Sequence, residues 1–380
     1  RCAIVTGVQT CALPIWESGF HDLSVLGEYT INADATTTDF TIGSMASVTA
    51  PALLSVDGDF TNEGDFNANS GTVFASAEGF DILDAEFIDE FTVAGGPSGF
   101  PQGLSFNDDG TKMFMASATG DDIDEWSLAV PFDVTTASYV FSLDIASQDT
   151  NPSDVAFNND GTKMYVAGTA STDIHEWSLT VPYDISTASY VDSLDVSVQE
   201  SAPRDLSFNN DGTKLYVLGQ RDFSVDEWLL SVPFDVSTGV YQDTLNVQSN
   251  GGFLPYGTAF SNDGTSLFVI GFEVGGGFVD EWALSTPFDT STGVFVDRFN
   301  TSGQERFPLD VELNNECSHM YVVGQTRGTI IEYVMDEAQT FSGLMTGQNA
   351  FNNLIDSGEL QLTFATSAST TGNFVSVLSA

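Results

Sequence analysis

The sequence predicts an all-β protein whose largest part is a five-bladed β-propeller with four-stranded blades. The main observation is a unit that recurs five times, and each copy contains a glutamate followed by an aromatic residue. The intervals between these aromatic residues are 51, 51, 54 and 51 positions, at Trp126, Trp177, Trp228, Trp282 and Tyr333. Each unit also contains four short strand-like runs and a strong turn signal, a combination typical of propeller blades.

The second complete copy illustrates how a blade is built. Its strand-like runs are 154–158, 163–168, 173–180 and 190–196. An Asn-Asp-Gly turn separates the first two runs, and glycine accepts the positive φ that a tight turn requires. A Val-Pro-Tyr-Asp segment separates the third and fourth runs, where proline is suitable because it cannot donate to a strand ladder.

The two ends of the array predict how the ring closes. Residues 86–93 align with the fourth strand of the later units, but no first, second or third strand of a unit precedes them. The last unit begins near Leu309 and stops after its third strand, at 330–334. We therefore expect the N-terminal strand to complete the last blade, which removes two exposed sheet edges.

The segments outside the propeller have a different repeat. Residues 17–79 and 336–380 alternate apolar and polar side chains, with glycine and asparagine at the turns, and we predict that they are β-solenoid-like. Residues 1–16 are excluded from the predicted fold, because residues 5–15 are one translation frame of a common short-read sequencing adapter. We expect this start to be an artefact of a metagenomic fragment, which leaves Cys317 as the one native cysteine and predicts no disulfide framework.

The charge of the chain limits its partners. Nine basic residues oppose 54 acidic ones, for a formal net charge of −45. Nucleic acid and anionic membranes are poor partners for such a surface, because both require cationic contacts. No apolar run approaches the roughly 18 residues that a membrane span needs. The acidity suits a saline or calcium-rich extracellular setting, where counter-ions screen self-repulsion, and a soluble, weakly aggregating surface explains it equally well.

Residues 80–335 also resemble a known family. The segment Phe157-Asn-Asn-Asp-Gly-Thr-Lys-Met-Tyr-Val is similar to the YVTN-type, WD40-like propellers of surface proteins, whose units follow a Pro…Phe-x-x-Asp-Gly-Thr-x-x-Tyr-Val pattern. The resemblance implies a propeller at the cell surface, in a family that includes adhesins, surface-layer proteins and hydrolases. This chain departs from the pattern by a Val-Pro-Phe-Asp segment in its units.

The flanking segments resemble the Gly/Asn-rich β-solenoid repeats of bacterial adhesins. In those repeats a strand such as Gly71-Thr-Val runs almost directly into a segment such as Ala338-Gln-Thr-Phe. Here the whole propeller separates the two. Since a closed ring brings its termini together, we predict that the propeller is inserted into a solenoid turn of a larger repetitive surface protein.

Three repeated features have structural explanations. We expect the aromatic residue of each Glu-aromatic pair in the core between blades, with the glutamate on buried polar groups; stacking on sugar rings is the alternative. The Asn-Asp-Gly turns offer one or two carboxylates each, which turn chemistry explains better than calcium binding. A lysine follows this turn in three units, and we expect solvated edge charges at Lys112, Lys163 and Lys214.

The start of each innermost strand contains the candidate site. Two successive positions follow each unit's proline, and equivalent positions in a propeller surround the mouth of the central channel. We predict ligand contacts at Gln102, Asp154, Arg204, Tyr256 and Asp310. A divalent cation, with calcium as the candidate cofactor, would be held by Asp154, Asp205 and Asp310. These carboxylates could equally accept local backbone N–H groups and fix the loops.

No catalytic constellation accompanies these residues. Gly-x-Ser-x-Gly, His-Glu-x-x-His, phosphate-binding glycine loops and metal-binding cysteine clusters are absent from the sequence. We therefore predict a non-catalytic extracellular binding or adhesion module, whose loop face contacts a glycan or a surface protein. One alternative is a propeller lactonase or hydrolase with a channel-bound divalent cation, and another is a structural spacer in a phage tail or surface layer.

Overall fold

A computed structural model describes residues 3–5, 20–26, 28–31, 35–56, 60–69, 72–75, 82–93, 101–117, 119–248, 253–315, 317–335, 340–343, 353–356, 363–364 and 374–376. The chain divides into two compact units. One is Asp81–Met335, and the other combines Arg1–Phe80 with Asp336–Ala380. Within the described part of the chain, no helix has the length and hydropathy needed to cross a membrane.

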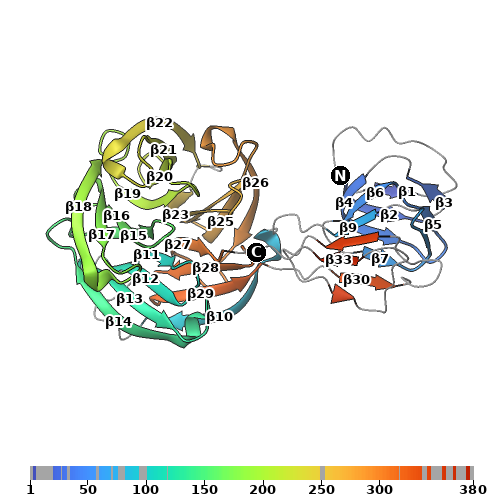
Figure 1. Cartoon of the computed structure of the whole chain (residues 1–380), viewed down its shortest axis with the longest axis horizontal. Coiled ribbons are helices and arrows are strands. Elements are labelled where there is room, and N and C mark those ends of the chain that lie inside the picture. Colours follow the sequence, from blue (N-terminus) through green and yellow to red (C-terminus); the bar gives the residue numbers. More distant parts are fainter. Residues whose placement is uncertain are drawn as a thin grey trace. The chain divides into compact units, whose positions relative to one another are not determined.

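Among its described residues, the larger unit forms five four-stranded antiparallel sheets arranged as the blades of a propeller, which confirms the predicted fold class (Figure 1). Blade 1 consists of β11 (Gly103–Phe106), β12 (Lys112–Ser117), β13 (Asp122–Leu128) and β14 (Ala137–Asp144). Blade 2 consists of β15 (Pro152–Phe157), β16 (Lys163–Gly168), β17 (Asp173–Leu179) and β18 (Ala188–Asp195). Blade 3 consists of β19 (Pro203–Phe208), β20 (Lys214–Gly219), β21 (Ser224–Leu230) and β22 (Gly239–Asn246).

The ring closes as predicted, with strands from both ends of the unit. Blade 4 consists of β23 (Leu254–Phe260), β24 (Ser266–Glu273), β25 (Gly276–Leu284) and β26 (Gly293–Asn300). Blade 5 consists of β27 (Pro308–Leu313), β28 (His319–Gly324), β29 (Thr329–Val334) and the N-terminal strand β10 (Glu86–Thr92). β10 pairs antiparallel with β29, with Phe91 opposite Ile330, so the blue-cyan strand lies beside the orange strands in Figure 1. This pairing removes the edge that β29 would otherwise expose.

The aromatic residues of the Glu-aromatic pairs lie in the core between blades, as predicted. Trp177 is 3% exposed and packs in one cluster with Val155 of its own blade and Phe114 of blade 1. Clusters of the same kind follow between the next blades. The tryptophans therefore hold neighbouring blades together, and they present no free face to a sugar.

The lysines that follow the turns are not solvated edge charges, so that prediction was wrong. Lys163 Nζ lies 2.8 Å from Glu176 Oε1 and donates a 2.7 Å hydrogen bond to the backbone carbonyl of Phe234, in blade 3. Glu176 Oε2 also accepts from the backbone N–H of Val236, at 3.2 Å. We call this Lys-Glu pair with its contacts to the next blade the latch.

The latch recurs around the ring in varied form. Lys112 with Glu125 and Lys214 with Glu227 repeat it at 2.7 Å each. In blade 4 Ser266 replaces the lysine and donates to Glu281, and in blade 5 His319 lies 3.7 Å from Glu332. The buried glutamates thus accept hydrogen bonds from polar groups of the next blade. Burying these groups without a hydrogen-bond partner would cost free energy.

Breaking the latch of blade 2 should destabilise the propeller. In Glu176→Ala the Lys163 ammonium loses its carboxylate partner and keeps the Phe234 carbonyl, while the buried Val236 N–H loses its acceptor. We expect the free energy of unfolding in urea to fall by about 2 kcal/mol. The matched control is Glu90→Ala, because Glu90 pairs with Arg327 at the surface, where that arginine side chain is 60% exposed. We expect its effect to stay below about 0.5 kcal/mol. Equal effects in the two variants would contradict a role of the latch in blade packing.

The Val-Pro-Phe-Asp segments explain how each outer loop returns onto its blade. The residue after the proline takes a positive φ in four blades, at Phe132, Tyr183, Phe234 and Phe288. Its ring covers the glycine of the Asn-Asp-Gly turn. A single 3-10 turn follows and leads into the fourth strand in each case: η2 (Val134–Thr136), η3 (Ile185–Thr187), η4 (Val236–Thr238) and η5 (Thr290–Thr292). η1 (Ile82–Asp84) precedes β10 in the same way.

The smaller unit is built from parallel strands, as a β-solenoid is. Its strands before the propeller are β1 (Ala3–Val5), β2 (Phe20–Val25), β3 (Glu28–Thr30), β4 (Ala35–Ile42), β5 (Ser47–Thr49), β6 (Leu53–Val56), β7 (Phe60–Asn62), β8 (Asp65–Asn67) and β9 (Thr72–Ala75). Those after it are β30 (Thr340–Gly343), β31 (Asn353–Asp356), β32 (Thr363–Phe364) and β33 (Phe374–Ser376). Phe40, Phe60 and Phe66 pack in its core, with ring centroids 5.7 and 5.4 Å apart.

Strands from both sides of the propeller belong to one sheet of this unit. β30 pairs in parallel with β7, and β31 pairs in parallel with β9. The next coil after β7 to β9 is therefore made by residues that follow the propeller in sequence. Of residues 1–16, which the sequence led us to exclude, the structure describes Ala3–Val5, which pairs with β2; the rest lies outside the described residues.

Candidate functional site

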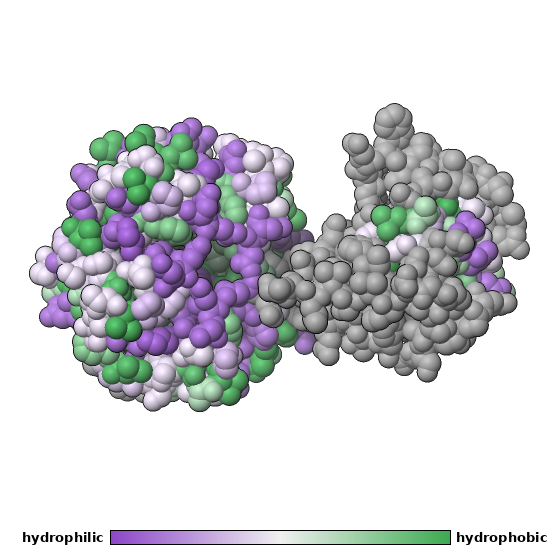
Figure 2. All heavy atoms as spheres, viewed as in Figure 1, coloured by the Kyte–Doolittle hydropathy of each residue, from purple (hydrophilic) through white to green (hydrophobic). Residues whose placement is uncertain are grey.

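The first strands of the five blades surround a cavity of about 250 Å³ in the middle of the propeller. Figure 2 shows a hollow there, bordered by hydrophilic residues. The cavity extends to the end of the propeller that carries the Asn-Asp-Gly turns, which we call the turn face; its lining there includes Asp108, Asn159, Asn210, Asn262 and Asn315. We call the opposite end, where the innermost strands begin, the rim face.

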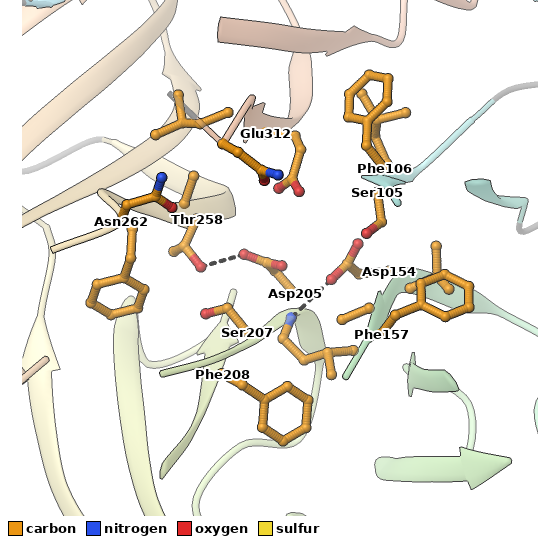
Figure 3. A pocket seen from close by; sticks show the side chains of 18 of the residues that line it. Ser105, Phe106, Asp154, Phe157, Asp205, Ser207, Phe208, Thr258, Asn262 and Glu312 are labelled. Carbon is orange, nitrogen blue, oxygen red and sulfur yellow. Dashed lines mark hydrogen bonds between the residues drawn. The ribbon is translucent and has the colours of Figure 1, made fainter. Parts of the chain in front are cut away.

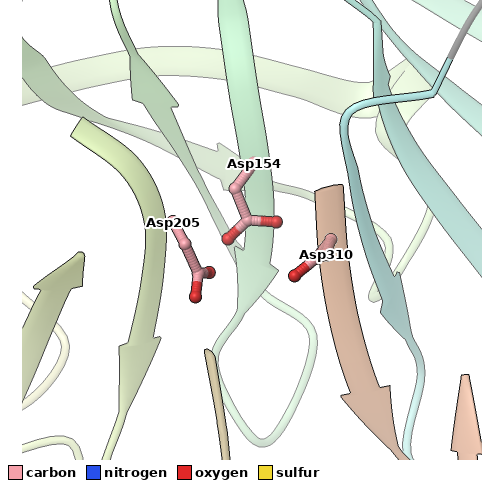
Figure 4. A group of neighbouring side chains, drawn as sticks. All are labelled: Asp154, Asp205 and Asp310. Carbon is pink, nitrogen blue, oxygen red and sulfur yellow. The ribbon is translucent and has the colours of Figure 1, made fainter. Parts of the chain in front are cut away.

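Three carboxylates meet at the inner end of this cavity. Oxygen atoms of Asp154, Asp205 and Asp310 all lie within 4.8 Å of one another (Figure 4). Each residue is 3% exposed. Sequence reasoning selected these three residues, and the closed ring brings them together from blades 2, 3 and 5. Asp154 and Asp310 are thus buried in the channel and do not lie on an exposed rim.

The trio also connects blades. Asp154 Oδ2 accepts the Leu206 N–H of blade 3 at 3.0 Å, and Asp310 Oδ2 accepts the Leu104 N–H of blade 1 at 2.7 Å. Asp205 accepts a hydrogen bond from the Thr258 hydroxyl of blade 4 (Figure 3). Each bond reaches the next blade of the ring, and Asp310 also accepts from its own neighbour, Val311. A carboxylate has about four acceptor sites, so these bonds leave capacity for a ligand.

Glycine occupies the two remaining blades at this level for a steric reason. A Cβ on Gly103 would overlap the carboxylate and backbone of Asp154. A Cβ on Gly257 would overlap Asp310 in the same way. The glycines of blades 1 and 4 are therefore a packing solution, in which these two blades make room for the aspartate side chains of blades 2 and 5.

Burial and mutual repulsion disfavour the ionised trio. Burial raises the pKa of Asp154 and of Asp310 well above the usual aspartate range, and the charge of Asp205 raises both further. Burial also raises the pKa of Asp205, an effect that hydrogen bonds from Asp154 and Thr258 partly offset. A positive charge placed among the three would reverse this balance, because it stabilises the ionised forms.

Two further polar groups face the cavity and have no partner among the described residues. Glu312 extends into it two residues beyond Asp310 and makes no hydrogen bond or ion pair there (Figure 3). Burial, followed by the charge of Asp205, raises the pKa of Glu312 to about 8. Ser207 lines the same cavity, and its buried Oγ has no hydrogen-bond partner. Polar groups left in this state normally indicate water, an ion or a ligand.

Sequence reasoning missed Glu312, Ser207 and Thr258. The signal for Glu312 was present, since the equivalent channel position in the other blades holds only serine or alanine: Ser105, Ala156, Ser207 and Ala259. Alternate side chains of this strand face the channel. A single glutamate among small residues at this position therefore indicates a cavity into which one blade extends a charged side chain.

The other three predicted contact residues lie at the rim face. Arg204 and Tyr256 touch, with the guanidinium carbon 5.2 Å from the centre of the tyrosine ring. Gln102 lies on blade 1, where its side-chain amide donates to the carbonyl of Pro101. The predicted set therefore separates into a buried carboxylate site and a more accessible Arg-Tyr contact.

The aspartates of the Asn-Asp-Gly turns accept hydrogen bonds from within their own turns, as predicted. Asp160 Oδ1 accepts from the Thr162 N–H at 3.0 Å and from the Thr162 hydroxyl, and these bonds lower the pKa of Asp160. Asp109 and Asp211 repeat the arrangement. Their carboxylates are thus used in turn geometry.

Comparison with known proteins finds likeness in structure only. No protein-family model and no curated protein sequence matches the chain. A protein of unknown function from Desulfotomaculum acetoxidans DSM 771 shares 14% identity at a TM-score of 0.38, over 60% of this chain and 66% of its own. The periplasmic gluconolactonase of Pseudomonas aeruginosa shares 14% sequence identity at a TM-score of 0.40, over 60% of this chain and 64% of its own. The β-propeller domain of Cps50 (Swd1) from Myceliophteria thermophila shares 11% sequence identity at a TM-score of 0.40, over 66% of this chain and 99% of its own.

The chain therefore spans less than two thirds of the length of the first two of these structures. At such identities the likeness concerns the propeller fold alone. The function of this chain has to be argued from its own residues.

Proposed function

We propose that the propeller is a cation-dependent binding module whose central cavity holds one divalent cation through Asp154, Asp205 and Asp310. The observation that carries this proposal is the convergence of the three carboxylates within 4.8 Å. Oxygen ligands of calcium lie 2.3–2.6 Å from the ion, so two ligands of one ion are at most about 5 Å apart. The spacing of the trio meets that limit.

The surroundings of the trio support a cation as the occupant. Glu312 adds a fourth acidic group to the same cavity, and Ser207 offers an oxygen without a partner. Only oxygen ligands are present, which favours calcium or magnesium over zinc or copper. The net charge of −45 raises the local concentration of cations, and an extracellular, calcium-rich setting would suit both the charge and the site.

Calorimetric titration of the chelator-treated full chain tests the proposal. We expect one calcium or magnesium ion per chain in 0.5 M NaCl, where salt screens weak binding to the acidic surface. Asp205→Asn keeps the side-chain volume and an oxygen for Thr258, and we expect it to weaken binding by at least about 100-fold. Asp192→Asn, an exposed neutralisation on β18, is the matched control and should leave the affinity unchanged.

The triple variant Asp154→Asn, Asp205→Asn, Asp310→Asn measures how tightly the rest of the chain binds cations when the carboxylate trio is absent. If the native chain binds cations no more tightly than this folded triple variant, the trio serves only to join blades. The propeller would then be better explained as a structural spacer.

A hydrolase is the second candidate for the same cavity. A bound cation lowers the pKa of its water, and the cavity has room for a small substrate beyond the carboxylates. Glu312, two residues beyond Asp310 on the same strand, would lie in the same cavity as the cation and its water, where its carboxylate could accept a proton. Turnover of small lactones by the cation-loaded chain, lost in Asp205→Asn, would favour this candidate over simple binding.

A further inference from the structure

The arginines of this acidic chain gather at one end of the propeller. Each described arginine lies at the rim face, in blades 3 to 5 or in the loop that joins blades 4 and 5: Arg204, Arg221, Arg298, Arg306 and Arg327. The described lysines lie instead near the turn face, where each forms a latch with a glutamate. In a chain with 54 acidic residues, this segregation marks one sector of the rim face as the place for a negative group.

Arg204 differs from the paired arginines of this sector. Arg298 pairs with Glu273 and Asp280, and Arg327 pairs with Glu90. Arg204 forms no ion pair with any carboxylate of the described residues, and its Nε and one terminal nitrogen donate to Gln220 Oε1 at 3.0 and 2.6 Å. The other terminal nitrogen, Nη1, keeps its donors. With the second hydrogen of Nη2 it can form the paired hydrogen bonds that a carboxylate accepts.

A row of aromatic rings continues from this guanidinium in blade 3, along blade 4, to the loop before blade 5. The guanidinium of Arg204 covers Tyr256, whose ring stacks on Phe272 at 5.2 Å with an interplanar angle of 21°. Phe272 in turn meets Phe307 edge-on at 5.1 Å. Phe307 is 43% exposed, next to the exposed Arg306. The row offers an apolar platform that begins at the guanidinium of Arg204, which has no carboxylate partner among the described residues.

We propose that this row, Arg204, Tyr256, Phe272 and Phe307, is a binding site for a saccharide that carries a carboxylate. The guanidinium would bind the carboxylate end-on, while the exposed aromatic surface covers the apolar C–H face of a neighbouring sugar ring. A densely charged polyanion such as nucleic acid is disfavoured by the overall charge of −45. An isolated acidic sugar among neutral ones avoids most of that repulsion.

The site is independent of the proposed cation site. The cavity lining does not include Arg204, Tyr256, Phe272 or Phe307, and the cavity extends to the opposite face. Saccharide binding is therefore expected to persist in chelator, so that the two proposals succeed or fail separately.

The test compares two oligosaccharides of similar length on the full chain in EDTA: a xylo-oligosaccharide with one glucuronic acid branch, and the unbranched neutral xylo-oligosaccharide. We expect binding of the acidic one, at least about 10-fold tighter than the neutral one, and weaker in 0.5 M than in 0.05 M NaCl. Arg204→Gln should lose this preference for the acidic oligosaccharide, and Arg204→Lys should recover only part of it, because lysine lacks the planar pair of donors.

Variants of the rings complete the test. Phe307→Ala should weaken binding of the acidic oligosaccharide by about 5-fold or more, whereas Tyr190→Ala should not. Tyr190 is a matched control because it is 42% exposed on β18, away from this sector. Thermal melting of each variant separates lost binding from lost folding. Equal binding of the two oligosaccharides, no binding of either, or an unchanged preference in a folded Arg204→Gln variant would overturn the proposal.

Discussion

Replacing Glu312 with glutamine should stabilise the cation-free propeller at pH 9 by about 2–3 kcal/mol. The carboxyl group lies in the central cavity next to the aspartate trio, and its pKa of about 8 means that the folded protein resists its ionisation. A pKa moved from 4.5 to about 8 corresponds to about 5 kcal/mol of folding free energy, which we reduce because cavity water screens part of it. Glutamine has nearly the same shape and never ionises.

The raised pKa of Glu312 determines how the stability of the native chain changes with pH. The folded-state pKa lies above the unfolded value, so the folded protein binds the proton more tightly. The stability of the native chain therefore falls as pH rises from about 4.5 to about 8. Below pH 4.5 both variants are neutral at this position and should be equally stable, and the gain in Glu312→Gln should grow to its full size above pH 8.

Urea unfolding in EDTA at pH 4.5, 7 and 9 measures the effect. Glu86→Gln, at an exposed position of β10, is the control for the loss of one negative charge from the whole chain. A Glu312→Gln variant that is no more stable than the native chain at pH 9 would show that the cavity does not disfavour this carboxylate.

Replacing Gly161 with alanine should destabilise the propeller by about 3 kcal/mol. Gly161 ends the Asn-Asp-Gly turn of blade 2 with a φ of +65°, which costs an L-residue roughly 1 kcal/mol or more. A Cβ there would also overlap the ring of Tyr183, which covers the glycine. Tyr183 is itself held by a 2.9 Å hydrogen bond from its N–H to the Gly161 carbonyl, so it cannot move away without breaking the loop.

Two variants separate the steric from the backbone contribution. In a Tyr183→Ala background the overlap is gone, and Gly161→Ala should then cost only about 1 kcal/mol. Gly303→Ala is the matched control, because a Cβ at Gly303 meets no atom within 4 Å, and it should change stability by less than about 0.5 kcal/mol. Additive costs of the two substitutions in urea unfolding would show that the ring does not restrict the glycine.

The local order of the propeller could be read from the sequence because it depends on local chemistry. Alternating side chains define the strands, and Asn-Asp-Gly defines the turn between the first two strands of blade 2, so the predicted range 163–168 coincides with β16. The unmatched strand at 86–93 and the incomplete last unit also predicted the pairing of β10 with β29. Each of these features follows from patterns of a few neighbouring residues.

The partners of charged side chains could not be read in this way. Lys163 looked like an edge charge because its position in the strand says nothing of the loop that packs on it. Its carbonyl acceptor at Phe234 lies in the next blade, 71 residues later in the chain. The Val-Pro-Phe-Asp segment likewise predicted the connection between the third and fourth strands, but not that its aromatic ring lies over the turn glycine of the same blade.

The sequence by itself determined the repeat, the strands, the turn chemistry and the way in which the ring closes, and it selected Asp154, Asp205 and Asp310 as a set. Only the tertiary structure decided that these carboxylates are buried within 4.8 Å of one another, that Glu312 joins them in one cavity, and that the arginines share one face. The physical reason is distance along the chain. Asp310 accepts one of its hydrogen bonds from Leu104, 206 positions away, and only closure of the ring brings such residues together.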